Sequence, residues 1–221
     1  DSTNQIEFFK YVDSCKGNIV DGDVFQIVLS KRFGADFSGD LLNVYRALRI
    51  INPSPYMYYM EFDNNFTVIG TSPEDLLKVK NRNATILPIA GTRRRGKTDV
   101  EDLALENDLM DDPKEIAEHT MLVDLARNDL GRVCKYGTVK VTEQMNVHRF
   151  SHVMHIVSRV EGKLNDDKDC IDALKASFPA GTVTGAPKIR AIQLLNDYEN
   201  LIRNVYAGAI GYIDFNGNLD M

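Results

Sequence analysis

The stretch Asp112–Arg132, with the sequence DPKEIAEHTMLVDLARNDLGR, most constrains the fold because it predicts an amphipathic helix with a clear start. Asp112 can accept a hydrogen bond as the N-cap, Pro113 suits the first helical position, and Glu115 follows three residues after the cap as in a capping box. At 100° per residue, Glu118 projects among apolar side chains, and Glu115 lies one turn back on the same side. One face of this helix therefore carries two carboxylates.

A carboxylate in an apolar stripe loses hydration, so it requires a cation, a metal, hydrogen bonds or a proton. In the structural interpretation, Glu118 pairs with a Lys or Arg from elsewhere and Glu115 is only a cap. In the functional interpretation, the face is an oxygen-ligand site for Mg2+, which usually takes one or two carboxylates and leaves other positions to water and substrate. The helix alone leaves both interpretations open.

Composition limits the function classes. The chain of 221 residues is 43% hydrophobic and long enough for one large domain. Its net charge of −6 gives no overall basic field for nucleic acid, so an anionic substrate would need local cations or a metal. The cysteines are odd in number, lack CxxC spacing and predict a reduced compartment with no zinc site: Cys15, Cys134 and Cys170. Without an apolar run of about 18 residues or a signal peptide, we expect a cytoplasmic protein.

Hydrophobic periodicity predicts interleaved helices and hairpin-spaced strands, which favours an α+β fold. The predicted helices span residues 6–17, 41–51, 100–110, 168–177 and 187–198, and the predicted strands 21–33, 56–62, 66–70, 84–89, 133–141, 150–160 and 206–215. In the strand 150–160 both alternating faces are largely apolar, so we expect it to be covered on both sides and His155 to be buried.

The segment Gly91–Thr98, GTRRRGKT, satisfies the P-loop pattern G-x-x-x-x-G-K-[ST]. A P-loop wraps phosphates with its backbone N–H groups at the start of a helix. Here three arginines crowd the loop, and Asp99, Glu101 and Asp102 place negative charge where a phosphate would lie. An NTPase is therefore a weak alternative.

Four further features each have a structural and a functional interpretation. The segment Phe178–Arg190, FPAGTVTGAPKIR, is either a turn capping a helix near Pro187 or an anion site built from exposed N–H groups. His155 is a core imidazole or a catalytic group. Glu74 is an acid at a helix N-terminus or a catalytic acid, and Tyr206 begins a strand as a plain edge tyrosine or as a ligand contact.

Taken together, these stretches resemble the chorismate-utilising enzymes, most closely the large subunits of anthranilate synthase, over nearly the full length of the chain. The motifs that carry the resemblance are GDVFQIVLSKRF, NPSPYMYYMEF, GTSPEDL, LPIAGTRRRG, DPKEIAEHTMLVDLARNDLGRV, RFSHVMHIVSRVEG, FPAGTVTGAPKIRA and YAGAIGYIDFNGNLDM. In that family GTRRRGKT corresponds to the G-T-R-x-R-G loop, which makes the P-loop a remote alternative.

The resemblance implies a four-layer α/β/β/α sandwich with the active site between the sheets. Residues 1–221 are expected to form an incomplete chorismate-binding catalytic domain, truncated at the C-terminal side and without the N-terminal regulatory segment. The family's substrate arginine, glycine-rich carboxylate loop and second Mg2+ glutamate come after Met221. We therefore expect negligible turnover from these residues alone.

Two positions distinguish the members of the family. Aminodeoxychorismate synthases carry a lysine nucleophile where this chain has Ala90, and isochorismate and salicylate synthases carry a lysine base where it has Gln26. Neither lysine is present, which favours ammonia as the nucleophile. The implied reaction converts chorismate and ammonia, supplied from glutamine by an amidotransferase partner, to anthranilate and pyruvate in tryptophan biosynthesis.

The resemblance also assigns roles to individual residues. Glu118 resembles the Mg2+ ligand, with Glu115 a weaker candidate, and Glu74 resembles the acid that protonates the departing hydroxyl. His155 resembles the catalytic histidine of the elimination step. Substrate contacts are expected from Gly91, Thr92, Thr184, Gly185, Ala186 and Tyr206, and Thr92 is also expected to act in catalysis. A partial tryptophan feedback site is expected from Pro55, Tyr56 and Met57.

Three alternatives stay open. The first is another chorismate-utilising enzyme, such as an aminodeoxychorismate or isochorismate synthase. The second is a non-catalytic module that binds chorismate or tryptophan, and the third is the P-loop NTPase.

Overall fold

The structure is a computed structural model that describes residues 3–63, 66–150 and 152–221. It divides into two compact units. The larger unit comprises Asp1–Arg32 and Leu76–Met221, and the smaller unit comprises Phe33–Asp75.

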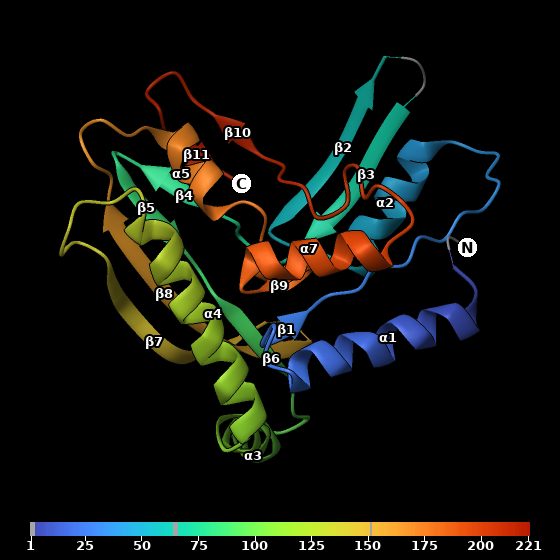
Figure 1. The fold of residues 1–221 in the computed structure, drawn as a ribbon, viewed down its shortest axis with the longest axis horizontal. Coiled ribbons are helices and arrows are strands. Elements are labelled where there is room, and N and C mark those ends of the chain that lie inside the picture. Colours follow the sequence, from blue (N-terminus) through green and yellow to red (C-terminus); the bar gives the residue numbers. More distant parts are fainter. Residues whose placement is uncertain (1–2, 64–65, 151) are drawn as a thin grey trace. The chain divides into compact units, whose positions relative to one another are not determined.

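The larger unit is built on an antiparallel sheet in the order β10-β11-β4-β5-β8-β6, with β7 also paired to β8 (Figure 1). The strands are β4 (Lys78–Lys80), β5 (Asn83–Ile86), β6 (Ile89–Arg94), β7 (Lys140–Arg149), β8 (Val153–Lys163), β10 (Tyr212–Ile213) and β11 (Leu219–Asp220). The β5 and β6 strands follow each other along one edge of β8, and β7 follows the opposite edge. The β8 strand is therefore the common partner of three strands.

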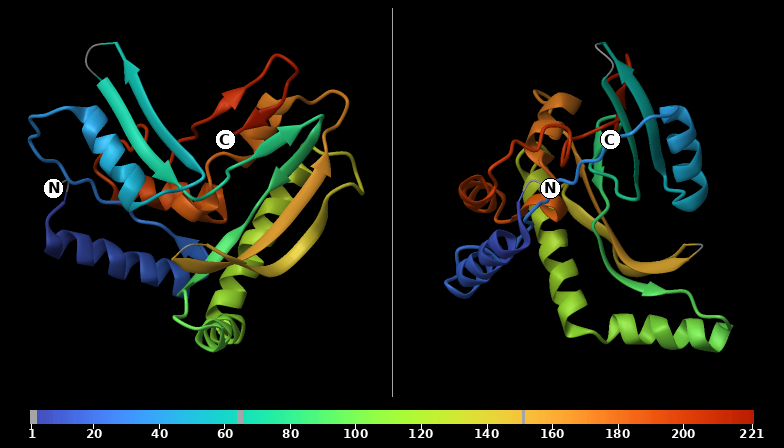
Figure 2. Two further views of the ribbon diagram at one scale, coloured as in Figure 1. Left: turned by 180° about the vertical axis from the view of Figure 1, so that it is seen from behind. Right: turned by 90° about the vertical axis from the view of Figure 1, so that its right-hand side faces the viewer.

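The helices of this unit are α1 (Gln5–Val20), α3 (Asp99–Met110), α4 (Pro113–Gly131), α5 (Cys170–Ser177), α6 (Gly181–Thr184) and α7 (Lys188–Tyr198). A separate two-stranded sheet pairs β1 (Gln26–Ile27) with β9 (Gly185–Ala186). The α4 helix contacts β6, β7 and β8 (Figure 1), and α3 runs in a clearly different direction from α4 (Figure 2).

The main core lies between α4 and one face of β8. Met154, Ile156, Ser158 and Val160 alternate along β8 and are fully buried, as the two-residue period of a strand requires. Val160 packs in one cluster with Leu130 of α4, and Met154 and Ile156 pack in a second cluster with Leu109 of α3 and Ile116 of α4. Each such apolar side chain contributes about 1.5–3 kcal/mol by leaving water, so this interface dominates the stability of the unit.

The smaller unit contains α2 (Leu41–Ile51) and the hairpin of β2 (Tyr56–Phe62) with β3 (Phe66–Ser72). Asp40 caps α2 by accepting a hydrogen bond from the backbone N–H of Leu42 at 2.8 Å. The hairpin pairs Tyr56 with Ser72 and Phe62 with Phe66, which confirms both predicted strands. The hairpin turn expected from the sequence Asp63-Asn64-Asn65 is described only at Asp63, because residues 64–65 lie outside the described ranges.

Several predicted strands are shorter than their apolar runs. In the run 21–33 only Gln26–Ile27 is a strand, and in 206–215 only Tyr212–Ile213. The run 84–89 divides into β5 and β6 around Pro88, which has no N–H to donate to a ladder. The strand predicted at 133–141 begins instead at Lys140, because residues 132–138 form the turns that follow α4.

Candidate functional site

One wall of a pocket of about 950 Å³ is a single face of α4. The face repeats every three to four residues, as a helical stripe must, and is completed on the other side by residues of β1, β7 and β9. The lining from α4 includes Lys114, Ala117, Glu118, Met121, Asp124, Leu125 and Asn128, and the facing side includes Gln26, Gln144 and Ala186.

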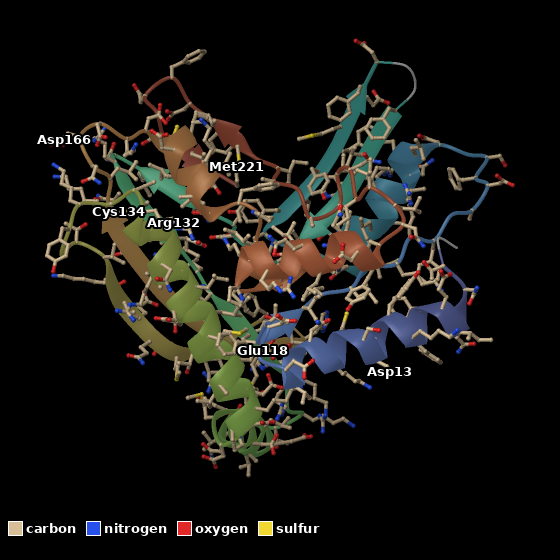
Figure 3. The ribbon with its side chains drawn as sticks, viewed as in Figure 1. Asp13, Glu118, Arg132, Cys134, Asp166 and Met221 are labelled. Atoms are coloured by element: carbon tan, nitrogen blue, oxygen red, sulfur yellow. The ribbon has the colours of Figure 1, made fainter. Side chains whose placement is uncertain are left out.

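Glu118 lies in the middle of this wall, half-buried, and projects from α4 toward β1 (Figure 3). The amide Nε2 of Gln26 approaches its Oε1 at 3.4 Å, which is a long hydrogen bond. The Oε1 of Gln26 is buried and has no hydrogen-bond partner. The carboxylate of Glu118 and this amide therefore form a polar centre beside the apolar Ala117, Met121 and Leu125 of the same wall.

The donors present here suit Mg2+ better than a softer metal. Glu118 offers carboxylate oxygens to the pocket, and a magnesium site needs only one or two protein carboxylates, with water and substrate completing six-fold coordination. Among the residues that the structure describes, no group of three or more His, Cys, Asp and Glu side chains is gathered to hold a metal. A cation at Glu118 would thus depend on ligands other than side chains of these residues.

Two cationic residues line the same pocket. Lys114 lies one turn before Glu118 on α4, and Arg127 lies farther along the helix, where it pairs with Asp124 at 3.0 Å. Both sides of this pair are more than half exposed, so it contributes little to stability. Positive charge therefore lies on both sides of Glu118 along α4, and that of Arg127 is shared with Asp124.

A second group of predicted residues, Gly91, Thr92 and His155, lies where β6 pairs with β8. His155 is half-buried rather than buried as predicted, and its Nδ1 lies 2.8 Å from the carbonyl oxygen of Gly91 and 3.1 Å from Oγ1 of Thr92. A carbonyl oxygen can only accept, so Nδ1 carries the proton in the neutral ring. The lone pair is then on Nε2, which can accept a proton in a reaction.

The contact between Gly91 and His155 depends on a β-bulge. Between Ala90 and Arg93, β6 contains one more residue than the paired segment of β8, and Gly91 adopts φ +69°. A Cβ at Gly91 would lie 2.9 Å from Cδ1 of Leu109 and 3.2 Å from Oε2 of Glu115, so only glycine fits without a shift of its neighbours.

The predicted capping box at the start of α4 is replaced by another arrangement. Asp112 caps the helix by accepting hydrogen bonds from the backbone N–H groups of Lys114 and Glu115. The carboxylate of Glu115 does not complete a capping box and instead lies 3.7 Å from Nη1 of Arg93. Glu115 is therefore part of a charged cluster at the β6 bulge, one turn away from the pocket that contains Glu118.

The loop GTRRRGKT is not a phosphate-binding loop. The backbone N–H groups of Gly96 and Lys97 each donate at 2.8 Å to carboxylates of α3, those of Asp102 and Glu101. Arg95 makes two hydrogen bonds to Asp102, which lower the pKa of that carboxyl to about 2. The donors that a P-loop would offer to phosphate are thus already paired, and the P-loop interpretation is wrong.

The segment before α7 contributes to the pocket through Ala186. Thr184, Gly185 and Ala186 are all buried, but of these three only Ala186 lines the pocket of Glu118. Gly185, with φ +135°, pairs with Ile27, and Ala186 pairs with Gln26. This pairing brings the loop before α7 next to the strand that carries Gln26.

Tyr206 lies apart from these groups. It is in a turn, not at the start of a strand as predicted, and is about half exposed. It lines a separate cavity of about 220 Å³ together with Tyr11, Tyr198 and Arg203, and the guanidinium of Arg203 lies 5.5 Å from its ring centroid. The structure does not bring Tyr206 to the pocket of Glu118.

The remaining predicted residues belong to the smaller unit. Glu74 is half-buried in a loop after β3, not at the start of a helix, and its backbone N–H lies 3.2 Å from Oγ of Ser72. Pro55 precedes β2, which begins with Tyr56 and Met57. Their predicted catalytic and feedback roles stay predictions.

Four residues that contact the sites are not singled out by the sequence. Lys114 could have been found, because it precedes Glu118 by one helical turn on the same face. Arg93, Arg127 and Gln144 gave no comparable signal, since their importance depends on contacts that tertiary folding creates. All three cysteines are buried and free, as side chains that pack in the core are. No helix in the described ranges combines the length and the hydropathy needed to cross a membrane.

A family model and the curated relatives of this chain point to the same protein family. A family model described as chorismate binding enzyme matches residues 1–221. Anthranilate synthase component 1 from Aquifex aeolicus is 56% identical over 215 residues, 97% of this chain and 43% of that protein. The chain thus spans less than half the length of this curated relative.

Solved structures confirm the fold class. The crystal structure of anthranilate synthase component I from Streptococcus pneumoniae matches with a TM-score of 0.91 and 46% identity, covering 99% of this chain and 48% of that one. The menaquinone-specific isochorismate synthase from Escherichia coli matches with a TM-score of 0.83 at 23% identity, over 99% of this chain and 50% of that one. The latter supports the α+β fold alone.

Proposed function

Because the chain belongs to the chorismate binding enzyme family, we propose that it forms part of an anthranilate synthase component I acting in tryptophan biosynthesis. The proposed reaction joins chorismate and ammonia, with anthranilate and pyruvate as products. The main support is the identity of 56% to a curated anthranilate synthase component 1, together with Gln26 and Ala90 at the two positions where other members carry lysine. Ammonia would come from glutamine through an amidotransferase subunit.

Glu118 is the proposed Mg2+ ligand. Its carboxylate faces a pocket with two cationic residues, Lys114 and Arg127, which suits a substrate with carboxylate groups. When bound there, Mg2+ would neutralise the ring carboxylate of chorismate and favour charge development in the ring. Gln26, whose Nε2 lies 3.4 Å from Oε1 of Glu118, would help to orient this carboxylate.

His155 is the proposed base of the elimination step. Its Nδ1–H donates to the carbonyl of Gly91, which leaves Nε2 to accept a proton as pyruvate departs. Thr92 supports the same ring through Oγ1 at 3.1 Å. Glu74 is the proposed acid for the departing hydroxyl, and Thr184, Gly185, Ala186 and Tyr206 are the proposed further substrate contacts.

We also propose a partial tryptophan feedback site and negligible turnover by these 221 residues alone. Pro55, Tyr56 and Met57 would form part of a tryptophan site in the whole protein. The 221 residues alone should turn chorismate over negligibly, because they span 43% of the length of the Aquifex aeolicus relative. The compartment that fits this role is the cytoplasm.

Calorimetric titration of the chain with chorismate, with and without Mg2+, tests the site. We expect Mg2+-dependent binding that is lost in Glu118→Gln and kept in Asp124→Asn, a matched change on the same pocket wall at a more exposed side chain. Equal binding by both variants would contradict the assignment of Glu118.

Product analysis of a longer protein that contains this chain tests the reaction. With chorismate, ammonia and Mg2+, fluorescent anthranilate is expected. Isochorismate or aminodeoxychorismate as the product would replace the proposed activity with that of another family member, and binding without turnover would favour a non-catalytic module.

A further inference from the structure

Arg93 connects β6 and α4, which carry residues of the proposed site, and also binds the end of α3. Its Nε donates to Asp108 near the end of α3 at 2.6 Å, and its Nη2 donates to Asp112, the N-cap of α4, at 3.0 Å. Its Nη1 lies 3.1 Å from the carbonyl oxygen of Thr92 and 3.7 Å from Glu115. One planar guanidinium therefore contacts the β6 bulge, the end of α3 and the first turn of α4.

The carboxylate of Asp112 binds Arg93 and the first turn of α4 at the same time. Its Oδ1 accepts from the backbone N–H groups of Lys114 and Glu115, while its Oδ2 accepts from Arg93. The same side chain thus caps the helix and fixes it to β6. Glu118 follows Asp112 by six residues, which is less than two turns of the same continuous helix, so its position relative to the bulge follows from this attachment.

The other side of the bulge holds His155. Gly91 presents its carbonyl oxygen to Nδ1 of His155, in a backbone conformation with φ +69°. Even-numbered residues of β8, such as Ile156 and Ser158, pack toward α4, and His155 belongs to the alternate face. Something must therefore hold the bulge to α4 if His155 and Glu118 are to act on one ligand.

We infer that Arg93 is the positioning residue that aligns the His155 edge of the site with the Glu118 wall, by clamping the β6 bulge to the N-terminus of α4. The inference rests on the proposed function in treating His155 and Glu118 as parts of one site. Arginine suits this role because its rigid fork satisfies several acceptors at once, whereas lysine is a point charge.

Arg94 provides the matched control. It is the next residue of β6 and also pairs with α3, through Glu101 at 2.5 Å, but its other hydrogen bond goes to the carbonyl oxygen of Arg95 and not to α4. Its side chain is 62% exposed, against 22% for Arg93. A comparison of the two positions separates alignment of the site from simple attachment of α3.

The experiment uses Arg93→Met, Arg93→Lys and Arg94→Met, with 15N ring resonances of His155 recorded for all proteins under one buffer condition, chosen so that the ring of the unmodified chain is neutral. His155→Gln identifies the signals. The unmodified chain and Arg94→Met should show a ring protonated at Nδ1. Arg93→Met should show a mixture of the two tautomers, because the released bulge withdraws the Gly91 carbonyl, and Arg93→Lys should restore the signal only in part.

Titration with Mg2+ alone provides the second measurement, with an expected loss of affinity of about tenfold in Arg93→Met, the effect typical of residues that orient a metal ligand. A wild-type tautomer in both Arg93 variants, or an equal change in Arg94→Met, would overturn the inference. Failure of the unmodified chain to bind Mg2+ would count against the proposed metal site instead, because the tautomer is measured without metal.

Discussion

The ammonium of Lys188 donates to the carboxylate of Asp129 at 2.6 Å inside the protein, where the two side chains are only 11% and 5% exposed. The same Nζ donates to the carbonyl oxygen of Ser177, while Oδ1 of Asp129 has no partner. Burial raises the pKa of Asp129 and lowers that of Lys188, and the mutual attraction opposes both shifts. The pair joins the end of α4 to the start of α7.

Replacing Lys188 with Met should lower the free energy of unfolding by about 3–5 kcal/mol, because it leaves a buried carboxylate without its cation. Urea denaturation measures this. Lys135→Met is the control: that lysine also pairs at 2.6 Å, but with Asp166, which is 85% exposed, so a small change is expected. The double variant Lys188→Met/Asp129→Leu should recover much of the loss, and a further loss would contradict this account.

His119 should make the stability depend on pH. It is fully buried on α4, its Nε2 lies 2.6 Å from Oγ of Ser158, and burial lowers its pKa from 6.5 to about 4. Between these values the unfolded chain binds a proton that the folded chain does not. The free energy of unfolding is therefore highest above pH 6.5, where the ring is neutral in both states, and it falls as the pH falls toward 4.

This loss should reach about 3 kcal/mol at most, from roughly 1.4 kcal/mol per pKa unit. Denaturation midpoints measured across the pH range should lose this slope in His119→Gln and keep it in His148→Gln, since His148 is exposed. An unchanged slope in His119→Gln would show that another group is responsible.

Substitution of Gly91 should be costly for two separate reasons. A left-handed backbone conformation costs a non-glycine residue about 1–2 kcal/mol, and a Cβ at Gly91 also meets Leu109 and Glu115. Gly137 has φ +76° but open space around the Cβ position. Gly91→Ala should therefore lower the unfolding free energy clearly more than Gly137→Ala in parallel thermal melts, and equal losses would mean that the crowding is relieved without cost.

Asp102 should govern part of the acid unfolding. The hydrogen bonds from Arg95, followed by that from the Gly96 N–H, lower its pKa from 3.8 to about 2. A lowered carboxyl pKa stabilises the fold above pH 3.8, and this contribution is lost as the pH falls toward 2. Asp102→Asn should flatten the stability profile in that window, with Asp124→Asn as an exposed control; a profile parallel to that of the unmodified chain would refute this role.

The sequence was most informative where local chemistry and long-range packing agree. The α4 helix was predicted because Asp112, Pro113 and the apolar period all specify it, and β8 because its alternating faces are apolar. The short strands β1 and β10 could not be predicted, since an apolar run does not show which of its residues finds a partner strand.

The site was predictable in its residue types more than in its geometry. Glu118 stood out as a carboxylate in an apolar stripe, but its contact with Gln26 joins positions 92 residues apart. The role of Arg93 depends on Asp108 and Asp112 meeting one guanidinium after two helices have formed. The bulge at Gly91 likewise arises from pairing with β8, and no local signal distinguishes it from an ordinary strand glycine.

The extra residue in the β6 bulge also determines which partners each of the three consecutive arginines, Arg93, Arg94 and Arg95, can reach. Beyond the bulge, Arg93 is directed to α4 and Arg94 is not, although composition treats them as equal. Deletion of one residue between Ala90 and Arg93 would keep the three consecutive arginines. Each of them would then shift by one position along β6 and point to the opposite face. In this loop the count of residues therefore carries as much information as their identity.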